Sequence, residues 1–232
     1  MIIEGSVALV TGANRGLGRH LAEQLRDRGA TVYAAARNPA AVTFAGVTPI
    51  ALDVTDLESI ARAAKITGDV TLLVNNAGSG TGASLLSGPL SDIRTEMETH
   101  YFGSLNVIRA FAPQLARGGE SAILNVLSVL SWMSVPALGA YSAAKSAEWS
   151  MTNGLRQELA AQGTAVTALH VGFMDTDMTR DIDAPKSDPA EVARFALDGI
   201  AAGRSELLAD TLSERVIAGL SGGVGALYPA FA

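Results

Sequence analysis

Near its N-terminus the chain reads Val7-Ala8-Leu9-Val10-Thr11-Gly12-Ala13-Asn14-Arg15-Gly16-Leu17-Gly18, an apolar run followed at once by three glycines. Such a run predicts a strand that is buried on both faces. The spacing G-x-x-x-G-x-G predicts a tight turn into a helix that begins near residue 16. Backbone N–H groups at this turn, together with the helix N-terminus, suit a pyrophosphate. Glycines also gather in strand-to-helix turns that bind nothing, so the motif alone decides little.

The rest of the chain repeats the same alternation of short apolar runs and longer alanine-rich helical stretches. We expect strands at 7–11, 31–36, 47–52, 70–75, 122–128, 165–170 and 206–209. We expect helices at about 16–29, 56–65, 91–117, 140–162, 189–202 and 211–220. This alternation predicts a single α/β domain over residues 1–232, a doubly wound parallel sheet of about seven strands flanked by helices on both faces. The loop 172–189 is expected to form a substrate lid, and residues 221–232 to be irregular.

Composition excludes several classes of protein. Of the 232 residues, 48% are hydrophobic, which excludes a disordered chain, and the net charge of −6 argues against nucleic acid or an anionic membrane as partner. The absence of cysteine excludes disulfides and thiolate sites, and three scattered histidines make a metal site unexpected. Residues 121–144 are uncharged but hold Asn125, Pro136 and five serines, which favours a strand, a turn and a helix over a membrane span. With no signal peptide visible, we expect a cytoplasmic protein.

The end of the second expected strand indicates which dinucleotide the turn would bind. An NAD site places an acidic residue there to accept from the ribose 2′-hydroxyl. This chain has Ala36 and Arg37 instead, and Arg15 lies in the glycine loop. Two arginines facing a 2′-phosphate favour NADP(H), although Arg37 can also be an ordinary exposed arginine. Asp53 ends the third strand, where it can accept from the adenine amino group or cap the next helix, a role that Asp56 also suits.

A tyrosine and a lysine four residues apart form the candidate catalytic pair. Tyr141 and Lys145 share one face of an expected helix. A nearby cation can lower the tyrosine pKa from about 10 by roughly 1–3 units, towards the range of a general acid. Ser128 ends a buried strand 13 residues before Tyr141, where its hydroxyl can reach the same crevice. An exposed tyrosine and a solvated lysine are the alternative for such a pair taken alone.

Taken together, these motifs resemble the short-chain dehydrogenase/reductase family over essentially the whole chain. The matching pieces are Thr11-Gly12-x-x-x-Gly16-x-Gly18, Asp53-Val54, Asn75-Asn76-Ala77-Gly78, Ser128 and Tyr141-Ser142-Ala143-Ala144-Lys145. The resemblance implies a Rossmann-type fold in which Tyr141 protonates a carbonyl oxygen, Ser128 holds that oxygen, and Lys145 binds the nicotinamide ribose. It also implies that Arg37 after the neutral Ala36 selects NADP(H). The cofactor-binding residues expected on this basis are Gly12, Asn14, Arg15, Gly16, Leu17, Gly18, Arg37, Asp53, Val54, Asn75, Ala77, Gly78, Tyr141, Lys145, Met174 and Thr176.

The sequence departs from the family pattern at two places. Aligning Gly103 puts His100 where the family has a relay asparagine. An imidazole titrates near neutrality, so His100 can hold a water or pass a proton itself, and its larger ring can also displace Lys145. Val171-Gly172 stands where the family has Pro-Gly, a milder change.

Apolar side chains are expected around the substrate. Leu130, Trp132, Phe173 and Met178 are the substrate-facing candidates, although each can instead belong to the core or an interface. They suit a hydrophobic ketone or aldehyde and its alcohol. We therefore expect an NADP(H)-dependent oxidoreductase of the carbonyl reductase or alcohol dehydrogenase type.

Other functions remain open at this point. One alternative is an NADP(H)-binding sensor or scaffold with weak catalysis because of His100; a lyase or epimerase would want further acid–base groups. The resemblance also implies a homodimer or homotetramer built on the helices at 91–117 and 140–162.

Overall fold

Seven parallel strands form one sheet in the computed structural model, which describes residues 1–117 and 119–229. The strands are β1 (Val7–Thr11), β2 (Thr31–Ala36), β3 (Thr48–Ala51), β4 (Leu72–Asn75), β5 (Ser121–Val126), β6 (Thr164–His170) and β7 (Glu206–Leu208). Their order is β3-β2-β1-β4-β5-β6-β7. The predicted doubly wound sheet is confirmed, including its last short strand.

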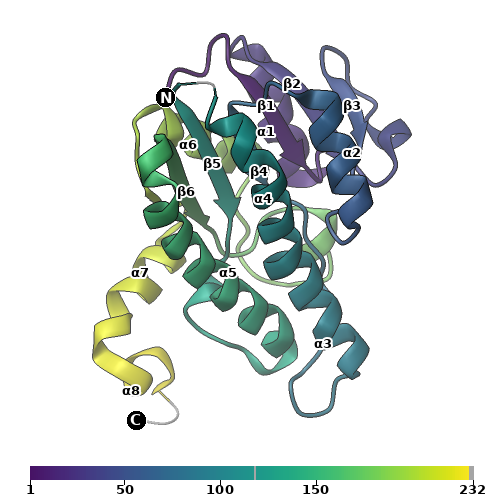
Figure 1. Ribbon diagram of the computed structural model, residues 1–232. Coiled ribbons are helices and arrows are strands. Elements are labelled where there is room, and N and C mark those ends of the chain that lie inside the picture. Colours follow the sequence, from purple (N-terminus) through teal and green to yellow (C-terminus); the bar gives the residue numbers. More distant parts are fainter. Residues whose placement is uncertain (118, 230–232) are drawn as a thin grey trace.

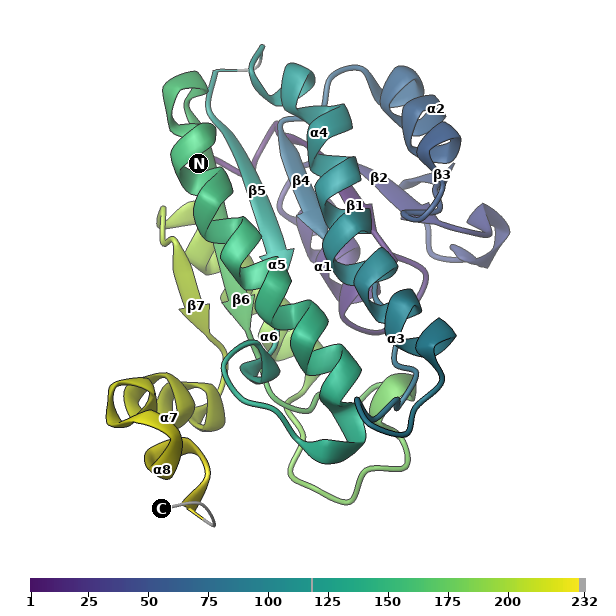
Figure 2. The ribbon, with the colours of Figure 1, turned by 60° about the horizontal axis from the view of Figure 1, so that its bottom comes forward.

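Helices cover both faces of this sheet (Figure 1). They are α1 (Gly16–Asp27), α2 (Leu57–Thr67), α3 (Leu90–Glu96), α4 (Ser104–Leu115), α5 (Gly139–Glu158), α6 (Pro189–Ala201), α7 (Thr211–Gly219) and α8 (Gly223–Leu227). One core cluster packs α1 and α6 against the sheet, and a second packs α2, α4 and α5 against the opposite face. Figure 2 shows α2, α4 and α5 in front of the sheet and α1 and α6 behind it. No helix among the described residues combines the length and apolarity needed to cross a membrane.

The strand order fixes where a ligand can bind. From β1 the chain adds β2 and β3 on one side of the sheet, and from β4 onward it adds strands on the other side. At such a switch point the loops that follow β1 and β4 diverge and leave a crevice between them. Thr11 ends β1 and Asn75 ends β4, so the glycine loop and Asn76-Ala77-Gly78 flank this crevice.

The prediction of one long helix at 91–117 is wrong in the middle of that range. Residues Met97–Gly103 form a π-helical segment between α3 and α4, and α4 ends at Leu115. Its i→i+5 pattern is frequent at functional sites, and here it carries His100. The apolar positions of α4 repeat like those of an ordinary helix, so periodicity did not reveal the change.

The C-terminal expectation needs a similar correction. Residues 221–232 were expected to be irregular, but 220–222 form a 3₁₀ turn and α8 follows; 230–232 lie outside the described residues. Val216, Leu220 and Leu227 belong to an apolar cluster with Trp132, and this packing outweighs the local glycines. The helical segment α7–α8 lies at the end of the sheet to which the strand arrows point (Figure 1).

Candidate active site

One cavity of about 920 Å³ lies at the carboxyl ends of the strands. It is lined by the glycine loop, the ends of β2 and β3, the segment after β4, and the residues around Ser128 and Tyr141. Almost every expected site residue lies on its wall. These are Gly12, Asn14, Arg15, Gly16, Leu17, Gly18, Arg37, Asp53, Val54, Ala77, Gly78, His100, Ser128, Leu130, Tyr141, Lys145, Phe173, Met174, Thr176 and Met178. Asn75 and Trp132 do not line it.

Two glycines of the loop are required because atoms of the segment after β4 and of the loop itself approach them closely. Gly12 has φ +66°, and a Cβ there would lie 3.0 Å from the Ala77 Cα. A Cβ on Gly18 would collide with the Asn76 side-chain amide and the Gly12 carbonyl oxygen. A side chain at either position would also fill the cradle in which a pyrophosphate contacts backbone N–H groups. The loop therefore fits a dinucleotide.

Asn76 fastens this loop to the end of β4. The Thr11 hydroxyl oxygen accepts hydrogen bonds from the Asn76 N–H at 2.9 Å and the Ala77 N–H at 3.0 Å. The Asn76 side-chain amide donates to the Thr11 carbonyl at 2.9 Å. These bonds close the floor of the crevice between β1 and β4.

Two arginines, Arg15 and Arg37, lie on the cavity wall together with Asp53 and Asp177. Ala36 is buried and leaves room, while Arg37 is exposed on the wall and makes no ion pair with any residue that the structure describes. Arg15 lies 3.4 Å from Asp177 of the loop after β6. Both guanidinium groups are thus near enough to the glycine loop to meet an anionic group on a bound dinucleotide.

Asp53 and Asp56 divide the roles that the sequence left open. The Asp53 carboxylate accepts from the Thr55 N–H at 2.9 Å and lies on the cavity wall. Asp56 caps α2 by accepting from the Glu58 N–H at 2.9 Å. Asp53 therefore remains available at the site.

Tyr141, Ser128 and Lys145 meet at the middle of the cavity. Burial raises the pKa of the Tyr141 phenol above its ordinary value, while the Lys145 charge and a hydrogen bond with Ser128 act to lower that pKa. The Lys145 Nζ lies 5.9 Å from the centre of the Tyr141 ring. Ser128 is fixed by accepting from the Leu130 N–H at 3.1 Å, which caps the turn after β5. The two hydroxyl groups can therefore contact one substrate atom.

Lys145 is held by two buried acceptors. Its Nζ donates to the Val126 carbonyl and to the Glu148 carboxylate, each at 2.7 Å. Burial acts to lower the pKa of the Lys145 ammonium, but Glu148, Tyr141 and Glu96 together outweigh burial and leave that pKa above its ordinary value. Lys145 is therefore a fixed cation.

His100 contacts the segment after β4, the end of α3 and the Tyr141 ring. Its Nε2 lies 3.0 Å from the Ser79 carbonyl oxygen and 3.2 Å from the Glu96 carboxylate, and its ring meets the Tyr141 ring edge-on at 5.1 Å. Nδ1 has no hydrogen-bond partner among the described residues. Burial acts to raise the pKa of Glu96, but hydrogen bonds from His100, Thr81 and Ser79 bring it down to about 2. His100 and Glu96 together fix the loop that begins at Ser79.

Comparison with known proteins places these features in a family. The family model described as short chain dehydrogenase matches residues 6–187 of this chain. A 3-oxoacyl-(acyl-carrier-protein) reductase of Vibrio harveyi is 37% identical over 198 residues, 79% of each chain. The chain belongs to the short-chain dehydrogenase family. It is an oxidoreductase of that family.

Solved structures of short-chain dehydrogenases show the same fold. A short chain dehydrogenase from Burkholderia cenocepacia J2315, in complex with NADP, is 39% identical with a TM-score of 0.94 over 99% of this chain and 98% of that one. The 3-ketoacyl-(acyl-carrier-protein) reductase of Brucella melitensis, complexed with NADH, is 25% identical with a TM-score of 0.82 over 89% of this chain and 96% of that one. Members thus bind either dinucleotide.

One end of the cavity is apolar. The substrate-facing candidates Leu130, Phe173 and Met178 line the cavity, with Met133, Val135, Leu138, Ile182 and Leu212. The fourth candidate, Trp132, does not line it. Its ring stacks on His170 at 3.8 Å and meets Trp149 edge-on, so it lies inside the cluster that holds α7 and α8.

Asn75 is a brace of the sheet rather than part of the cavity wall. Its side-chain amide donates to the Asn125 side chain at 2.9 Å, and the Asn125 amide donates to Thr152 at 2.9 Å. Strand alternation points Asn75 to the face of the sheet that α5 covers, and Asn76 lies in the loop after β4.

Sequence reasoning missed Glu96 and Glu148, and it quoted Asn76 only as part of the motif Asn75-Asn76-Ala77-Gly78. Glu148 stands three residues after Lys145, a spacing that brings helical side chains together. Glu96 stands four before His100, and the same rule applies. Charged pairs at these two spacings are common on exposed helices. Here both pairs are buried, and the sequence alone does not show that burial.

Proposed function

We propose that the chain is an NADP(H)-dependent oxidoreductase that interconverts a hydrophobic ketone or aldehyde and its alcohol. The observation that carries this proposal is the position of the Tyr141 and Ser128 hydroxyls. They lie side by side between the glycine-loop end and the apolar end of one cavity, with the Lys145 ammonium behind them.

Each catalytic side chain then has one task. When bound, NADP(H) supplies or accepts the hydride. In reduction, Ser128 donates a hydrogen bond to the substrate carbonyl oxygen, and Tyr141 gives that oxygen its proton as the carbonyl carbon gains hydride. The phenolate left on Tyr141 is stabilised by Lys145 until a proton returns from solvent. Oxidation runs through the same steps in reverse, with Tyr141 taking the hydroxyl proton.

The charged end of the cavity supports NADP(H) over NAD(H). Arg37 is unpaired among the described residues, Arg15 also lines the cavity and pairs with Asp177, and the small Ala36 stands where an acidic residue would repel a phosphate. The Burkholderia relative in complex with NADP agrees with this proposal. The glycine loop, Asp53, Val54, Ala77, Gly78, Met174 and Thr176 would hold the remainder of the dinucleotide.

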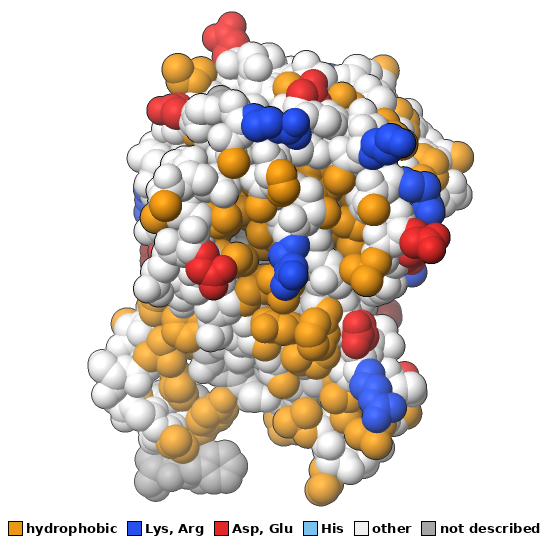
Figure 3. Space-filling view, in the orientation of Figure 1, with side chains coloured by type: hydrophobic (Ala, Val, Ile, Leu, Met, Phe, Trp, Pro, Cys, Tyr) orange, Lys and Arg blue, Asp and Glu red, His pale blue; other side chains and the backbone are white. Residues whose placement is uncertain are grey.

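The lid and the assembly complete the proposal. Residues 1–232 would act as one domain, with residues 172–189 closing over a hydrophobic substrate. On the face seen in Figure 3, hydrophobic side chains gather over α4 and α5. Phe102, in the π-helical segment before α4, is exposed, and Trp149 and Met151 of α5 are half-buried. This face supports a homodimer or homotetramer in the cytoplasm.

A cofactor-and-substrate panel tests the proposed function. We expect oxidation of NADPH, followed at 340 nm, with hydrophobic ketones or aldehydes, and slower oxidation of NADH at equal concentration. Substrates that carry a carboxylate or phosphate should react poorly because the substrate end lacks free cations among its described residues. Binding of NADPH with no turnover of any carbonyl would contradict the proposal and favour a sensor or scaffold.

A further inference from the structure

A buried carboxylate on α5 faces the catalytic lysine. Glu148 is 1% exposed, and its Oε2 lies 2.7 Å from the Lys145 Nζ. Its Oε1 accepts a hydrogen bond from the Ser104 hydroxyl at 2.8 Å, at the first turn of α4. Both carboxylate oxygens are therefore occupied, and the side chain is fixed between two helices.

This contact changes the charge that Tyr141 experiences. A lysine alone would favour the phenolate strongly, because an opposite charge within about 4–6 Å shifts such an equilibrium by 1–3 pH units. Glu148 makes the pair neutral overall, so part of this effect is cancelled. A buried ion pair of this kind gives little net stability, so stability does not account for its presence.

Other charged groups near Tyr141 do not replace the cancelled charge. From α3, Glu96 adds a further negative charge, and from the π-helical segment His100 presents a ring edge. The turn after β5 contributes the neutral Ser128. Lys145 and Glu148 on α5 complete the set, so Glu148 is the group whose removal would leave Lys145 uncompensated.

We propose that Glu148 is a positioning residue that holds Lys145 and, by neutralising it, keeps Tyr141 protonated to a higher pH than Lys145 alone would allow. The consequence for catalysis rests on the proposed function: the acid form that reduces carbonyls persists into the alkaline range. Ser104 orients the carboxylate for this task. Glu148 touches neither reacting atoms nor the glycine loop, and acts through Lys145.

The direct test follows the ionisation of Tyr141 rather than turnover. Tyrosinate absorbance at 295 nm is recorded against pH for the wild-type protein and Glu148→Gln, and the signal of Tyr141 is isolated by subtracting Tyr141→Phe. We expect Glu148→Gln to lower the Tyr141 transition by about 1 pH unit, a roughly tenfold rise in phenolate at a fixed pH below the transition. An unchanged or higher transition would overturn the proposal.

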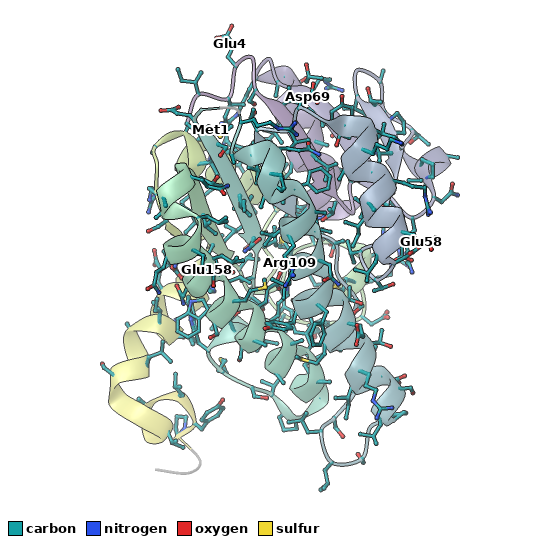
Figure 4. All side chains as sticks on the ribbon, viewed as in Figure 1. Met1, Glu4, Glu58, Asp69, Arg109 and Glu158 are labelled. Carbon is teal, nitrogen blue, oxygen red and sulfur yellow. The ribbon has the colours of Figure 1, made fainter. Side chains whose placement is uncertain are left out.

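Two further variants distinguish the effect of the Glu148 charge from the effect of its side-chain shape. Glu158 lies exposed at the end of the same helix (Figure 4), so Glu158→Gln removes an equal charge and should leave the transition in place. Glu148→Asp keeps the charge but not the length, and should move the transition down by less than Glu148→Gln. A purely structural role predicts the opposite order, because glutamine is isosteric with glutamate. Should Glu148→Gln fail to fold, Lys145→Met and the double variant Lys145→Met/Glu148→Gln decide. The double variant should have the lower Tyr141 transition because it lacks the Glu148 charge, and equal transitions in the two would refute the role.

Turnover gives an independent readout. With a reducible ketone, the alkaline fall of kcat/KM should move to lower pH by the same amount in Glu148→Gln. If no carbonyl is reduced, the proposed function fails while the absorbance still tests Glu148. If reduction occurs and neither transition moves, Glu148 has no such role.

Discussion

In the proposed function, the choice between NADP(H) and NAD(H) depends on Arg37 and Arg15. We expect Arg37→Ala to lower kcat/KM for NADPH by about 10- to 100-fold, since charge-assisted hydrogen bonds contribute roughly 1.5–3 kcal/mol. The value for NADH should change by less than about twofold, because NADH lacks the 2′-phosphate that Arg37 would contact. Arg109→Ala is the matched control, an exposed arginine on α4 away from the cavity (Figure 4). Equal losses with both cofactors would mean that Arg37 does not read the phosphate.

Glu96 makes stability depend on acid pH. Its pKa of about 2 in the folded chain lies below the ordinary 4.5. The stabilisation is therefore complete above about pH 5 and is lost as the pH falls through 4.5 towards 2, a change of about 3 kcal/mol. In urea unfolding, the difference in unfolding free energy between wild type and Glu96→Gln should shrink by that amount over this range. A difference independent of pH would show that Glu96 is not ionised in the folded chain.

At the residue scale, local spacing in the sequence was enough to bring three candidate side chains to one cavity, and their catalytic roles stay predictions. Tyr141, Lys145 and Ser128 follow from a helical repeat and a strand end, and all three line the cavity. Asn75 and Asn76 are adjacent and chemically identical, and only the exact end of β4 decides which one faces the loop. Predicting the role of Glu148 would have required knowing that its side chain is buried, which a single sequence does not show.

The first turn of α1 shows how an element builds the site. We expect Gly18→Ala to raise the Kd for NADPH at least tenfold and to cost about 1–3 kcal/mol of stability, because its Cβ would collide with Asn76 and Gly12. Fluorescence titration and thermal unfolding measure the two effects. At Gly154 in α5 a Cβ would meet nothing within 4 Å, so Gly154→Ala should stabilise by about 0.5–1 kcal/mol. Similar behaviour of the two variants would contradict the close approach.

Elements were predictable in type but not in their irregularities. Apolar runs and glycines located every strand of the sheet to within a few residues. The π-helical segment Met97–Gly103 is held by contacts of Glu96 and His100 with the loop after β4. Those contacts are distant in sequence, so no local pattern announces them.

At the scale of the whole molecule, Trp132 joins the C-terminal helices to the sheet. It is 7% exposed and packs between His170 and Trp149. We expect Trp132→Ala to cost about 3–5 kcal/mol of stability while the substrate KM stays within about twofold. Met133→Ala, next in sequence but on the cavity wall, should change KM with a smaller loss of stability. A KM change confined to Trp132→Ala would restore it as a substrate residue.

The doubly wound form of the sheet was predictable from the sequence because right-handed crossovers leave few arrangements of alternating strands and helices. The position of the cavity follows from that order. The helical form of residues 220–227 was not accessible, because it depends on packing against Trp132 and its neighbours far away in the chain.

The most direct test of the whole account is the turnover of Tyr141→Phe. The variant keeps the ring but loses the proton donor, so kcat for NADPH-dependent reduction of a hydrophobic ketone should fall by about 10²- to 10⁴-fold. The Kd for NADPH should be unchanged. Reduction at the wild-type rate by Tyr141→Phe would contradict the account, because another group would then supply the proton.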